Sequence, residues 1–390
     1  MADNSNKIHF LIRGPNLTKK YKTAVSLHSH SELSREGLGF VPRYASRIPI
    51  LSTFYRLEQN RYLAKKGIGF DFRRAYWIPP LSPESVLESE RKRIESDLQM
   101  HALVSLSDHD TVSKIGSSPP CLEWTVSINS IELHLGIYNL PSDQAKNISS
   151  QLVTQSGRLN QRRLLELLSW LNENQDVLIV LNHPFADLTS SGSERVKQTV
   201  MELIRKGRDI IHALEINGYR PWKENKEIAQ LAARFSLGLV GGGDRHGYAP
   251  NAILSLTNAH TFCEYVEEVR YDRRGIVAIM PEYCKNLVAR KLQAAVDFFR
   301  FPPTGWATNQ HWMDRVFFQL EDGVVRPLSY YWNHTIPLWA KPATWFLQLL
   351  ASRYAWSTIQ ALFRSNEIPL SSAQVAVLSD WENSFLLSHS

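Results

Sequence analysis

Cysteine is scarce in this chain of 390 residues. The three cysteines, Cys121, Cys263 and Cys284, are odd in number and far apart, which excludes a disulfide framework and a cysteine-rich zinc site. Disulfide-free chains are typical of reducing compartments, and the first residues show no basic start followed by an apolar run. The sequence therefore predicts a cytoplasmic protein.

Long apolar runs and blocks of like charge are also lacking. No stretch reaches the roughly 20 apolar residues that a membrane-spanning helix needs, so we expect no membrane partner. The net charge of +6 is spread along the chain, and fits an anionic substrate no better than it fits simple solubility. A hydrophobic content of 43% and a charged content of 21% are those of an ordinary globular protein.

Apolar runs alternate with helical patterns between residues 102 and 300. Ser82 is the expected N-cap of a helix that runs to about residue 100, because proline and an acid follow it directly. The predicted strands lie at 7–13, 102–107, 122–128, 131–138, 177–181, 211–216 and 237–240. This order predicts an α/β fold with a largely parallel sheet, either open or closed into a barrel.

Tryptophan becomes frequent after residue 300. Helical patterns at about 311–320, 343–364 and 371–387 predict a helical extension over residues 301–390. Its expected role is to cap the main domain, with a platform for a partner or substrate as the alternative.

Histidines and acids gather where the apolar runs end. Two histidines one residue apart in a strand point to the same face, so they can share a metal ion. Polar clusters just past buried parallel strands are also where α/β folds place active sites. Taken singly, each cluster is more often a turn, a core group or a surface group, but their recurrence favours a metal site. The clusters are His28/His30, Asp108/His109, Glu123 with His134, His183 and Asp244/His246.

In this order the motifs resemble the PHP superfamily, named for polymerase and histidinol phosphatase, over residues 22–265. They read His-x-His, Ser-Asp-His-Asp-Thr, a Glu with a His eleven residues on, Asn-His-Pro and Gly-Gly-Asp-Arg-His. The resemblance implies a distorted barrel of seven parallel β/α units that holds two or three metal ions and hydrolyses phosphoesters. It places a PHP-like domain at residues 1–300, with an insertion at about 31–100, before the extension at 301–390.

The resemblance also implies a role for each matched residue. The first metal is assigned to His28, His30 and Asp244, the second to His134 and His183, and the third to His109 and His246, with Glu123 as a bridge. The sequence departs from the family at Ser34-Arg35-Glu36-Gly37. Either Glu36 completes the third site, or Arg35 occupies the position and weakens that site or holds a phosphate.

These residues predict hydrolysis of a small phosphomonoester or a nucleotide, in which a metal-bound hydroxide attacks phosphorus. Mixed imidazole and carboxylate ligands suit Mn, Fe or Zn. Arginine binds phosphate through two parallel hydrogen bonds, which makes Arg35, Arg220 and Arg245 candidates. Arg245 could equally pair with a structural acid. Asp108 is a catalytic candidate as a residue next to the metal ligands.

Two other functions stay open. A 5′–3′ exonuclease on RNA or DNA would need a basic, aromatic-lined track for the nucleic acid. The insertion is rich in such residues, although packed loops often are too: Arg43, Arg47, Arg56, Arg61, Lys65, Lys66, Arg73 and Arg74, with Phe54, Tyr55, Tyr62, Phe70, Phe72, Tyr76 and Trp77. A metal-binding scaffold without activity is the third reading. The sequence indicates no oligomeric state.

Overall fold

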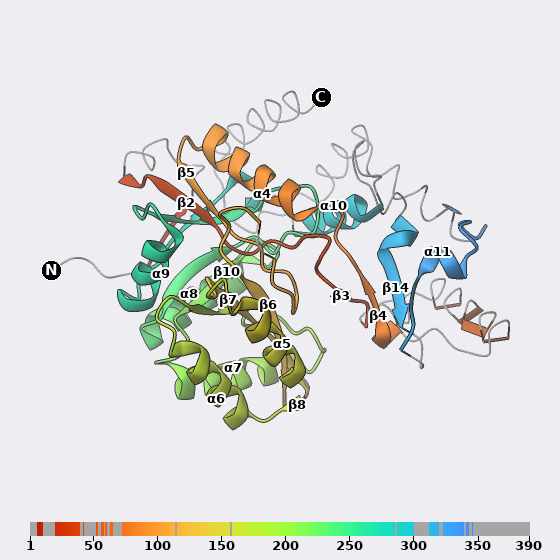
Figure 1. The fold of residues 1–390 in the computed structure, drawn as a ribbon, viewed down its shortest axis with the longest axis horizontal. Helices are drawn as coiled ribbons and strands as arrows, with labels where there is room; N and C mark the ends of the chain where they lie inside the picture. The colour runs from red at the N-terminus through yellow and green to blue at the C-terminus, as the bar shows by residue number, and fades with distance from the viewer. Residues whose placement is uncertain are drawn as a thin grey trace.

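The computed structural model describes eight segments and a few isolated positions. The segments are residues 6–10, 20–39, 72–113, 115–156, 158–284, 287–299, 312–319 and 323–338, and the isolated positions are 42, 52–53, 56–57, 59–60, 63–64, 341–342 and 345. These residues form a mixed α/β fold with three sheets, and helices pack on the two larger ones (Figure 1). The predicted α/β class is confirmed.

The first sheet has the strand order β1-β13-β12-β2-β5. Its strands are β1 (Lys7–Phe10), β13 (Ile276–Ile279), β12 (Ile253–Thr257), β2 (Thr23–Ser26) and β5 (His101–Val104). The pairs β1–β13 and β2–β5 are parallel, whereas β12 runs antiparallel to both of its neighbours. The parallel pairing of β2 with β5 brings the segments that follow these two strands to the same end of the sheet.

The second sheet has the order β11-β10-β9-β7-β6-β8. Its strands are β11 (Gly238–Gly242), β10 (Ala213–Asn217), β9 (Leu178–Asn182), β7 (Ile131–Tyr138), β6 (Leu122–Ile128) and β8 (Arg158–Leu159). β9, β10 and β11 are parallel, but β7 is antiparallel to both β6 and β9. The largely parallel sheet that the sequence predicts is therefore only partly right.

A two-residue turn joins β6 to β7, as expected. Asn129 and Ser130 have φ angles of 52° and 67°, and two central residues with positive φ are typical of the tight turn that suits twisted strands. The turn sets the register of the hairpin, in which Glu123 lies opposite Gly136.

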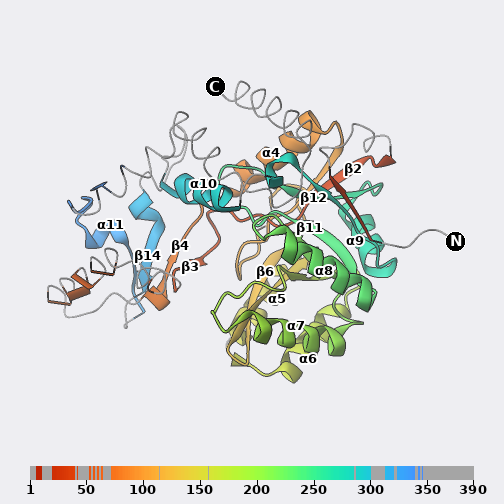
Figure 2. The same cartoon turned by 180° about the vertical axis from the view of Figure 1, so that it is seen from behind.

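The helices bury apolar stripes on the sheets. They are α4 (Pro83–Lys92), α5 (Ala145–Gln155), α6 (Gln161–Asn172), α7 (Ser193–Gly207), α8 (Trp222–Phe235), α9 (Phe262–Tyr271) and α10 (Leu287–Phe299). In α6, Asn160 accepts a hydrogen bond from the backbone of Arg163 as N-cap, and Leu164, Leu168 and Leu171 recur at helical spacing and are buried. α4 begins at the predicted Ser82 cap and continues as a π-helical turn, Arg93–Asp97. Viewed from behind, α8 covers the end of the second sheet that carries β10 and β11 (Figure 2).

Isolated backbone bridges connect the two larger sheets where their strands end. Ser29 bridges to Arg245, and His109 bridges to Glu123. The backbone N–H of Asp244 donates to the carbonyl of His28 at 2.9 Å, and that of His30 donates to the carbonyl of Arg245 at 3.0 Å. The described strands do not close into a barrel. The bridges nevertheless gather the segments that follow β2, β5 and β11 around one point.

A third sheet joins the insertion to the chain after residue 300. Its order is β15-β14-β4-β3, with bounds β15 (Val325–Pro327), β14 (Val316–Gln319), β4 (Ala75–Trp77) and β3 (Glu36–Gly37). A short helix, α11 (Leu328–Tyr331), follows β15. Figures 1 and 2 both show this sheet at one side of the molecule.

The helix predicted at 311–320 is wrong. Trp312–Arg315 forms a 3₁₀ turn, and the next four residues form β14. Alternation explains the error, because Val316 and Phe318 are buried on the sheet while Gln319 is exposed. The helices predicted at 343–364 and 371–387 lie outside the described residues, apart from residue 345, and the boundary at residue 300 stays a prediction. Among the helices that are described, none has the length and apolar character needed to cross a membrane.

Candidate metal centre

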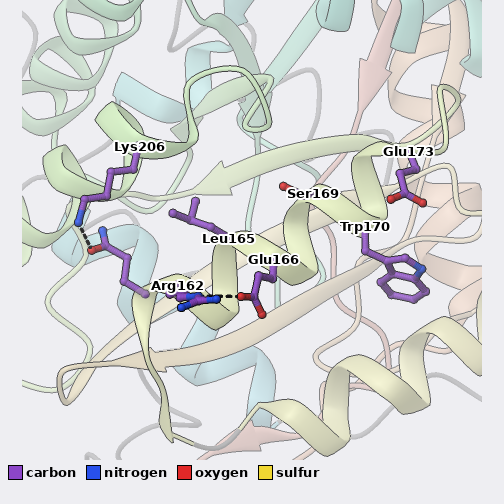
Figure 3. A pocket seen from close by; sticks show the side chains of 8 residues that line it. Arg162, Leu165, Glu166, Ser169, Trp170, Glu173 and Lys206 are labelled. Atoms are coloured by element: carbon purple, nitrogen blue, oxygen red, sulfur yellow. Dashed lines mark hydrogen bonds and ion pairs between the residues drawn. The ribbon is translucent and has the colours of Figure 1, made fainter.

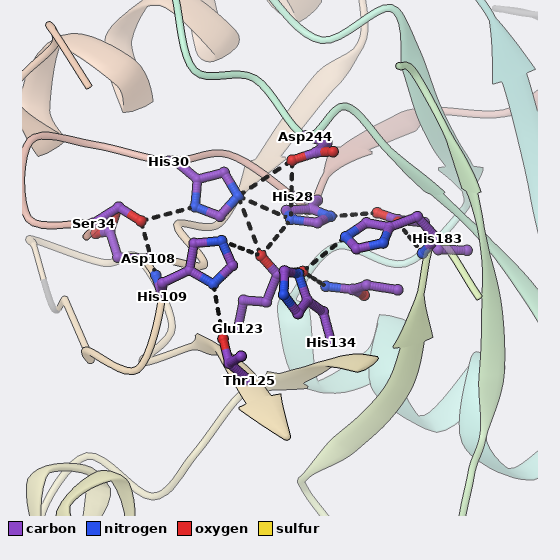
Figure 4. A network of polar contacts seen from close by, with 12 residues as sticks. His28, His30, Ser34, Asp108, His109, Glu123, Thr125, His134, His183 and Asp244 are labelled. Atoms are coloured by element: carbon purple, nitrogen blue, oxygen red, sulfur yellow. Dashed lines mark hydrogen bonds and ion pairs between the residues drawn. The ribbon is translucent and has the colours of Figure 1, made fainter. Parts of the chain in front are cut away.

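Side chains from both larger sheets converge where the bridges join the strand ends (Figure 4). Glu36 of β3 joins them. Residues after β2, β5, β9 and β11 contribute, as do β6 and β7 themselves. All nine predicted metal ligands lie in groups whose ligand atoms are within 4.8 Å of one another. The nine are His28, His30, Glu36, His109, Glu123, His134, His183, Asp244 and His246.

Glu123 lies at the middle of this cluster and is fully buried. Its Oε2 lies 3.2 Å from Nε2 of His28 and 3.3 Å from Nε2 of both His30 and His109. Its Oε1 lies 3.3 Å from Nδ1 of His134 and 3.3 Å from Nε2 of His183. One carboxylate therefore faces imidazoles on two sides, and its role as a bridging ligand stays a prediction.

Asp244 and Glu36 face further imidazoles. Oδ1 of Asp244 lies 3.7 Å from Nε2 of His28 and 3.5 Å from Nε2 of His30. Oε2 of Glu36 lies 3.3 Å from Nε2 of His109 and 3.1 Å from Nε2 of His246. Of the two residues considered for the third site, Glu36 faces these imidazoles, and its role as a metal ligand stays a prediction.

The groupings differ in one respect from the roles that the resemblance implies. His28, His30 and Asp244 form one group, as expected, and Glu36 joins His109, His246 and His30 in another. His183 and His134 fall into different groups, although both groups contain Glu123. His183 is grouped with His28, whereas His134 is grouped with His109. A second metal ligated by His134 and His183 together stays a prediction.

The donor atoms fit a cation. Oε2 of Glu123 is buried and has no hydrogen-bond partner, which is costly for a carboxylate oxygen in a protein interior. Nε2 of His28 and Nε2 of His30 lie only 3.0 Å apart. A metal ion would satisfy two buried imidazole nitrogens that face each other and a buried carboxylate oxygen that makes no hydrogen bond. Imidazole with carboxylate suits Zn, Mn or Fe. The buried clusters are compatible with metal ions.

The outward nitrogen of four imidazoles is held by a neighbour. Nδ1 of His28 lies 2.5 Å from Glu215, that of His30 lies 3.2 Å from Ser34, and that of His109 lies 3.2 Å from Thr125. Nδ1 of His246 lies 2.8 Å from the carbonyl of Asp244. A proton on each Nδ1 leaves the Nε2 lone pair pointing inward, as a metal ligand requires.

Charge interactions within the cluster shift the pKa values strongly. Burial alone would raise the pKa of Glu123, but His28, His134 and His109 outweigh it and hold that pKa well below its usual range. Burial opposes the charged form of His134, yet Glu123 and Glu132 raise its pKa to about 10. Without metal, the buried carboxylates therefore keep protons on neighbouring imidazoles.

His246 and His30 respond in opposite ways to the same surroundings. Burial lowers both pKa values, but Glu36 raises that of His246 to about 9. For His30 burial dominates, and the nearby His246 adds to it, so its pKa falls to about 4. Metal entry must displace protons from some imidazoles and not from others.

Sequence reasoning missed Glu215, which supports two of the candidate ligands. Besides its contact with His28, its Oε2 accepts the backbone N–H of His183 at 2.7 Å and Nδ2 of Asn217 at 3.0 Å. A signal was present, because an acid inside the apolar strand Ala213–Asn217 must be buried and therefore needs partners. Asn182 was likewise missed, and its Nδ2 donates to Oε1 of Glu123 at 2.9 Å.

Backbone geometry at the cluster is unusual. His183 and Asp244 have φ angles of 26° and 54°, which are rare for residues other than glycine and occur preferentially at functional sites. Gly242 and Gly243 do not serve only to form a turn. A Cβ at either position would overlap a neighbouring side chain. The side chains are Glu215 at Gly242 and Asn251 at Gly243. The glycines therefore leave room for Glu215 to contact His28 and for Asn251 to donate to the His28 carbonyl at 3.2 Å.

Arg245 and Asp108 are held by partners outside the nine candidate ligands, and their catalytic roles stay predictions. The buried guanidinium of Arg245 donates to Glu90 at 2.6 Å and to the carbonyls of Gly247 and Tyr248 at 2.9 Å. It is the structural ion pair that the sequence left as the alternative. The Asp108 carboxylate accepts hydrogen bonds from Ser31 and Ser113 and fastens the loop that carries the first histidines.

The other two arginines also have partners. Arg35 is exposed, and its guanidinium lies over the ring of Tyr76 at 5.3 Å. It directly precedes β3 and stacks on Tyr76, whereas Glu36 is buried against His109 and His246. Arg220 pairs with Glu224 at 2.6 and 2.7 Å. Their roles in phosphate binding stay predictions.

An open hollow on the outer surface lies away from this cluster (Figure 3). It is lined by α6 and by Lys206 of α7. Its polar groups already pair with one another, since Arg162 contacts Glu166 at 3.0 Å and Lys206 contacts Gln161 at 2.9 Å. The hollow contains none of the nine predicted ligands, so we place the chemistry at the buried cluster.

Comparisons with known proteins give only distant matches. No protein-family model and no curated protein matches the chain. Among solved structures, PsfC from Pseudomonas syringae has 13% identity and a TM-score of 0.36, covering 53% of this chain and 87% of its own. A protein from Bifidobacterium adolescentis, provisionally described as a metal-dependent phosphoesterase, has 12% identity and a TM-score of 0.29, covering 49% and 91%. An amidohydrolase from Chromobacterium violaceum has 14% identity and a TM-score of 0.33, covering 57% and 87%.

Proposed function

We propose that this chain is a metal-dependent hydrolase and that its substrates are phosphoesters, either small phosphomonoesters or nucleotides. The observation that carries the proposal is Glu123, whose two oxygens face separate sets of imidazoles and whose buried Oε2 makes no hydrogen bond. A carboxylate in this position can hold two cations close together. Paired metal ions activate water and stabilise both the attacking and leaving oxygens of a displacement at phosphorus.

The chain's own residues would orient and enclose the centre. Glu215, Ser34 and Thr125 fix the imidazoles of His28, His30 and His109 with Nε2 inward. Glu36 and Asp244 supply negative charge on two further sides. Full burial of His28, His30 and Glu123 keeps water away from the innermost donors, which strengthens electrostatic interactions there.

A phosphoester is the substrate we favour over an amide. Donor groups surround Glu123 on several sides, an arrangement suited to the several oxygens of a phosphoryl group. Arg220 lies near the cluster. Its backbone N–H contacts the carbonyl of Asn217, and Nδ2 of Asn217 is 3.5 Å from Asp244. The net charge of +6 adds to the attraction of an anion.

The test removes two ligands together. The double variant His28→Ala/His30→Ala, purified without chelator, should lose bound metal in elemental analysis and lose hydrolysis of an aryl phosphate. The matched control is His101→Ala/His260→Ala, which removes two exposed histidines outside the cluster and should keep both. An aryl anilide assayed in parallel separates phosphoester from amide hydrolysis. Metal and turnover retained by the His28/His30 variant would overturn the proposal.

A further inference from the structure

Trp77 lies beside the candidate metal centre. It is on β4, directly opposite Glu36 on β3, so the two side chains share one face of the strand pair. Its indole ring is 5.9 Å from the imidazole of His246, at an interplanar angle of 39°. An aromatic ring therefore stands next to two of the residues that face the cluster.

The contacts of Trp77 differ from those of its neighbour. Tyr76, on the opposite face, is stacked on Phe317 at 5.2 Å and 17° and carries Arg35 on its ring. Trp77 meets Phe298 at 5.1 Å and 79°, an edge-to-face contact, and its side chain is only partly buried. A perpendicular contact joins the edge of one ring to the face of the other, so it covers less ring surface than stacking does.

The geometry points to a base-stacking wall: we propose that Trp77 stacks on the nucleobase of a nucleoside phosphate whose phosphate lies at the metal centre. This inference rests on the proposed function and narrows its substrate class. Aromatic side chains stack on every base through the π-face. A ring adjacent to His246 would lie about where the base of a nucleotide falls once its phosphate is held by the cluster. The base belongs either to a free mononucleotide or to the terminal residue of a strand.

The experiment compares Trp77→Leu with Trp170→Leu, which changes an exposed tryptophan of α6 that lines the surface hollow (Figure 3). Calorimetry measures the binding of adenosine monophosphate, and kinetics compare its hydrolysis with that of glycerol phosphate, which has no ring. Trp77→Leu should weaken nucleotide binding by roughly 5- to 150-fold. It should lower the ratio of kcat/KM for the nucleotide to kcat/KM for glycerol phosphate by a similar factor. Trp77→Phe should restore part of both, and Trp170→Leu should match the parent protein.

Each outcome separates the inference from the proposed function. An equal loss on both substrates, or nucleotide binding unaltered in Trp77→Leu, overturns the stacking wall and leaves the hydrolase intact. Failure of the parent protein to bind the nucleotide also overturns it, even if glycerol phosphate is hydrolysed. Binding that depends on Trp77 without hydrolysis of any phosphoester supports the wall and contradicts the hydrolase. Tighter binding of a single-stranded oligonucleotide, with steep salt dependence, identifies the strand end as the source of the base.

Discussion

Replacing Glu215 by glutamine tests whether this carboxylate orients the centre. Glu215 is nearly fully buried, and its two oxygens serve different partners, Nδ1 of His28 and the backbone N–H of His183. Glutamine keeps the size of the side chain but has only one acceptor oxygen. If that oxygen stays with His183, the amide N–H₂ faces His28 and favours the tautomer whose proton is on Nε2. That proton points into the cluster and blocks metal binding.

The expected loss depends on the role of such supporting groups. Removing a hydrogen-bond partner of a metal-ligating histidine typically costs 10- to 100-fold in metal affinity, or about 1.4–2.7 kcal/mol of binding free energy. Because the buried His28 loses its contact with a carboxylate, the free energy of unfolding of the metal-free protein should also fall by about 1–3 kcal/mol. Competition with a metallochromic chelator measures the first quantity, and denaturant unfolding measures the second.

The control is Glu202→Gln, which changes an exposed acid paired with Lys206 on α7 and should leave metal affinity unaltered. Circular dichroism must show that both variants keep the parent fold. A folded Glu215→Gln protein whose metal affinity is within twofold of the parent value would refute the reasoning. It would mean that neither the tautomer of His28 nor the backbone at His183 depends on this carboxylate.

Two further predictions concern protons and a buried charge. The pKa of His134 is raised to about 10 and that of His246 to about 9, so both hold protons at pH 7 in the metal-free protein. Metal affinity should therefore rise about tenfold per pH unit for each proton that the metal displaces. Calorimetry in buffers of different ionisation enthalpy counts the displaced protons. Raised pKa values stabilise the metal-free fold fully below pH 6.5 and progressively less as pH rises through 9 and 10, so its denaturation midpoint should fall there. Glu90→Gln leaves the Arg245 guanidinium buried without a counter-charge and should lower the free energy of unfolding by about 3–5 kcal/mol, measured with denaturant. Its control, Glu166→Gln on the surface of α6, should leave unfolding unaltered.

The candidate ligands could be predicted from the sequence because most of them lie on, or directly after, a short apolar strand. A strand such as Leu178–Asn182 is recognisable from its run of apolar residues, and the residues after it must lie at the edge of the sheet. Histidine and acid at several such edges then predict a shared site without knowledge of strand order. The closeness of all nine residues agrees with that reasoning.

Contacts between residues far apart in the sequence could not be predicted in this way. No local pattern indicates that Arg245 meets Glu90, which lies 155 residues earlier, or that β14 pairs with β4. Arginine beside two ligands looks the same in sequence whether it binds phosphate or neutralises a buried acid. These two roles can be distinguished only from the contacts of the guanidinium in the folded structure, where it is surrounded by Glu90 and backbone carbonyls.

The support of the centre is distributed over the whole fold, and this bears on how a metal would bind. Glu215 comes from β10, Ser34 from the loop before β3, and Thr125 from β6, yet each holds a different imidazole in its inward orientation. Gly242 has no side chain where Glu215 passes. In a zinc finger the metal provides the folding free energy, whereas here hydrogen bonds between elements already orient the donors. Metal binding at this centre should therefore replace protons within an assembled site, and its free energy should report the site's chemistry more than the ordering of the chain.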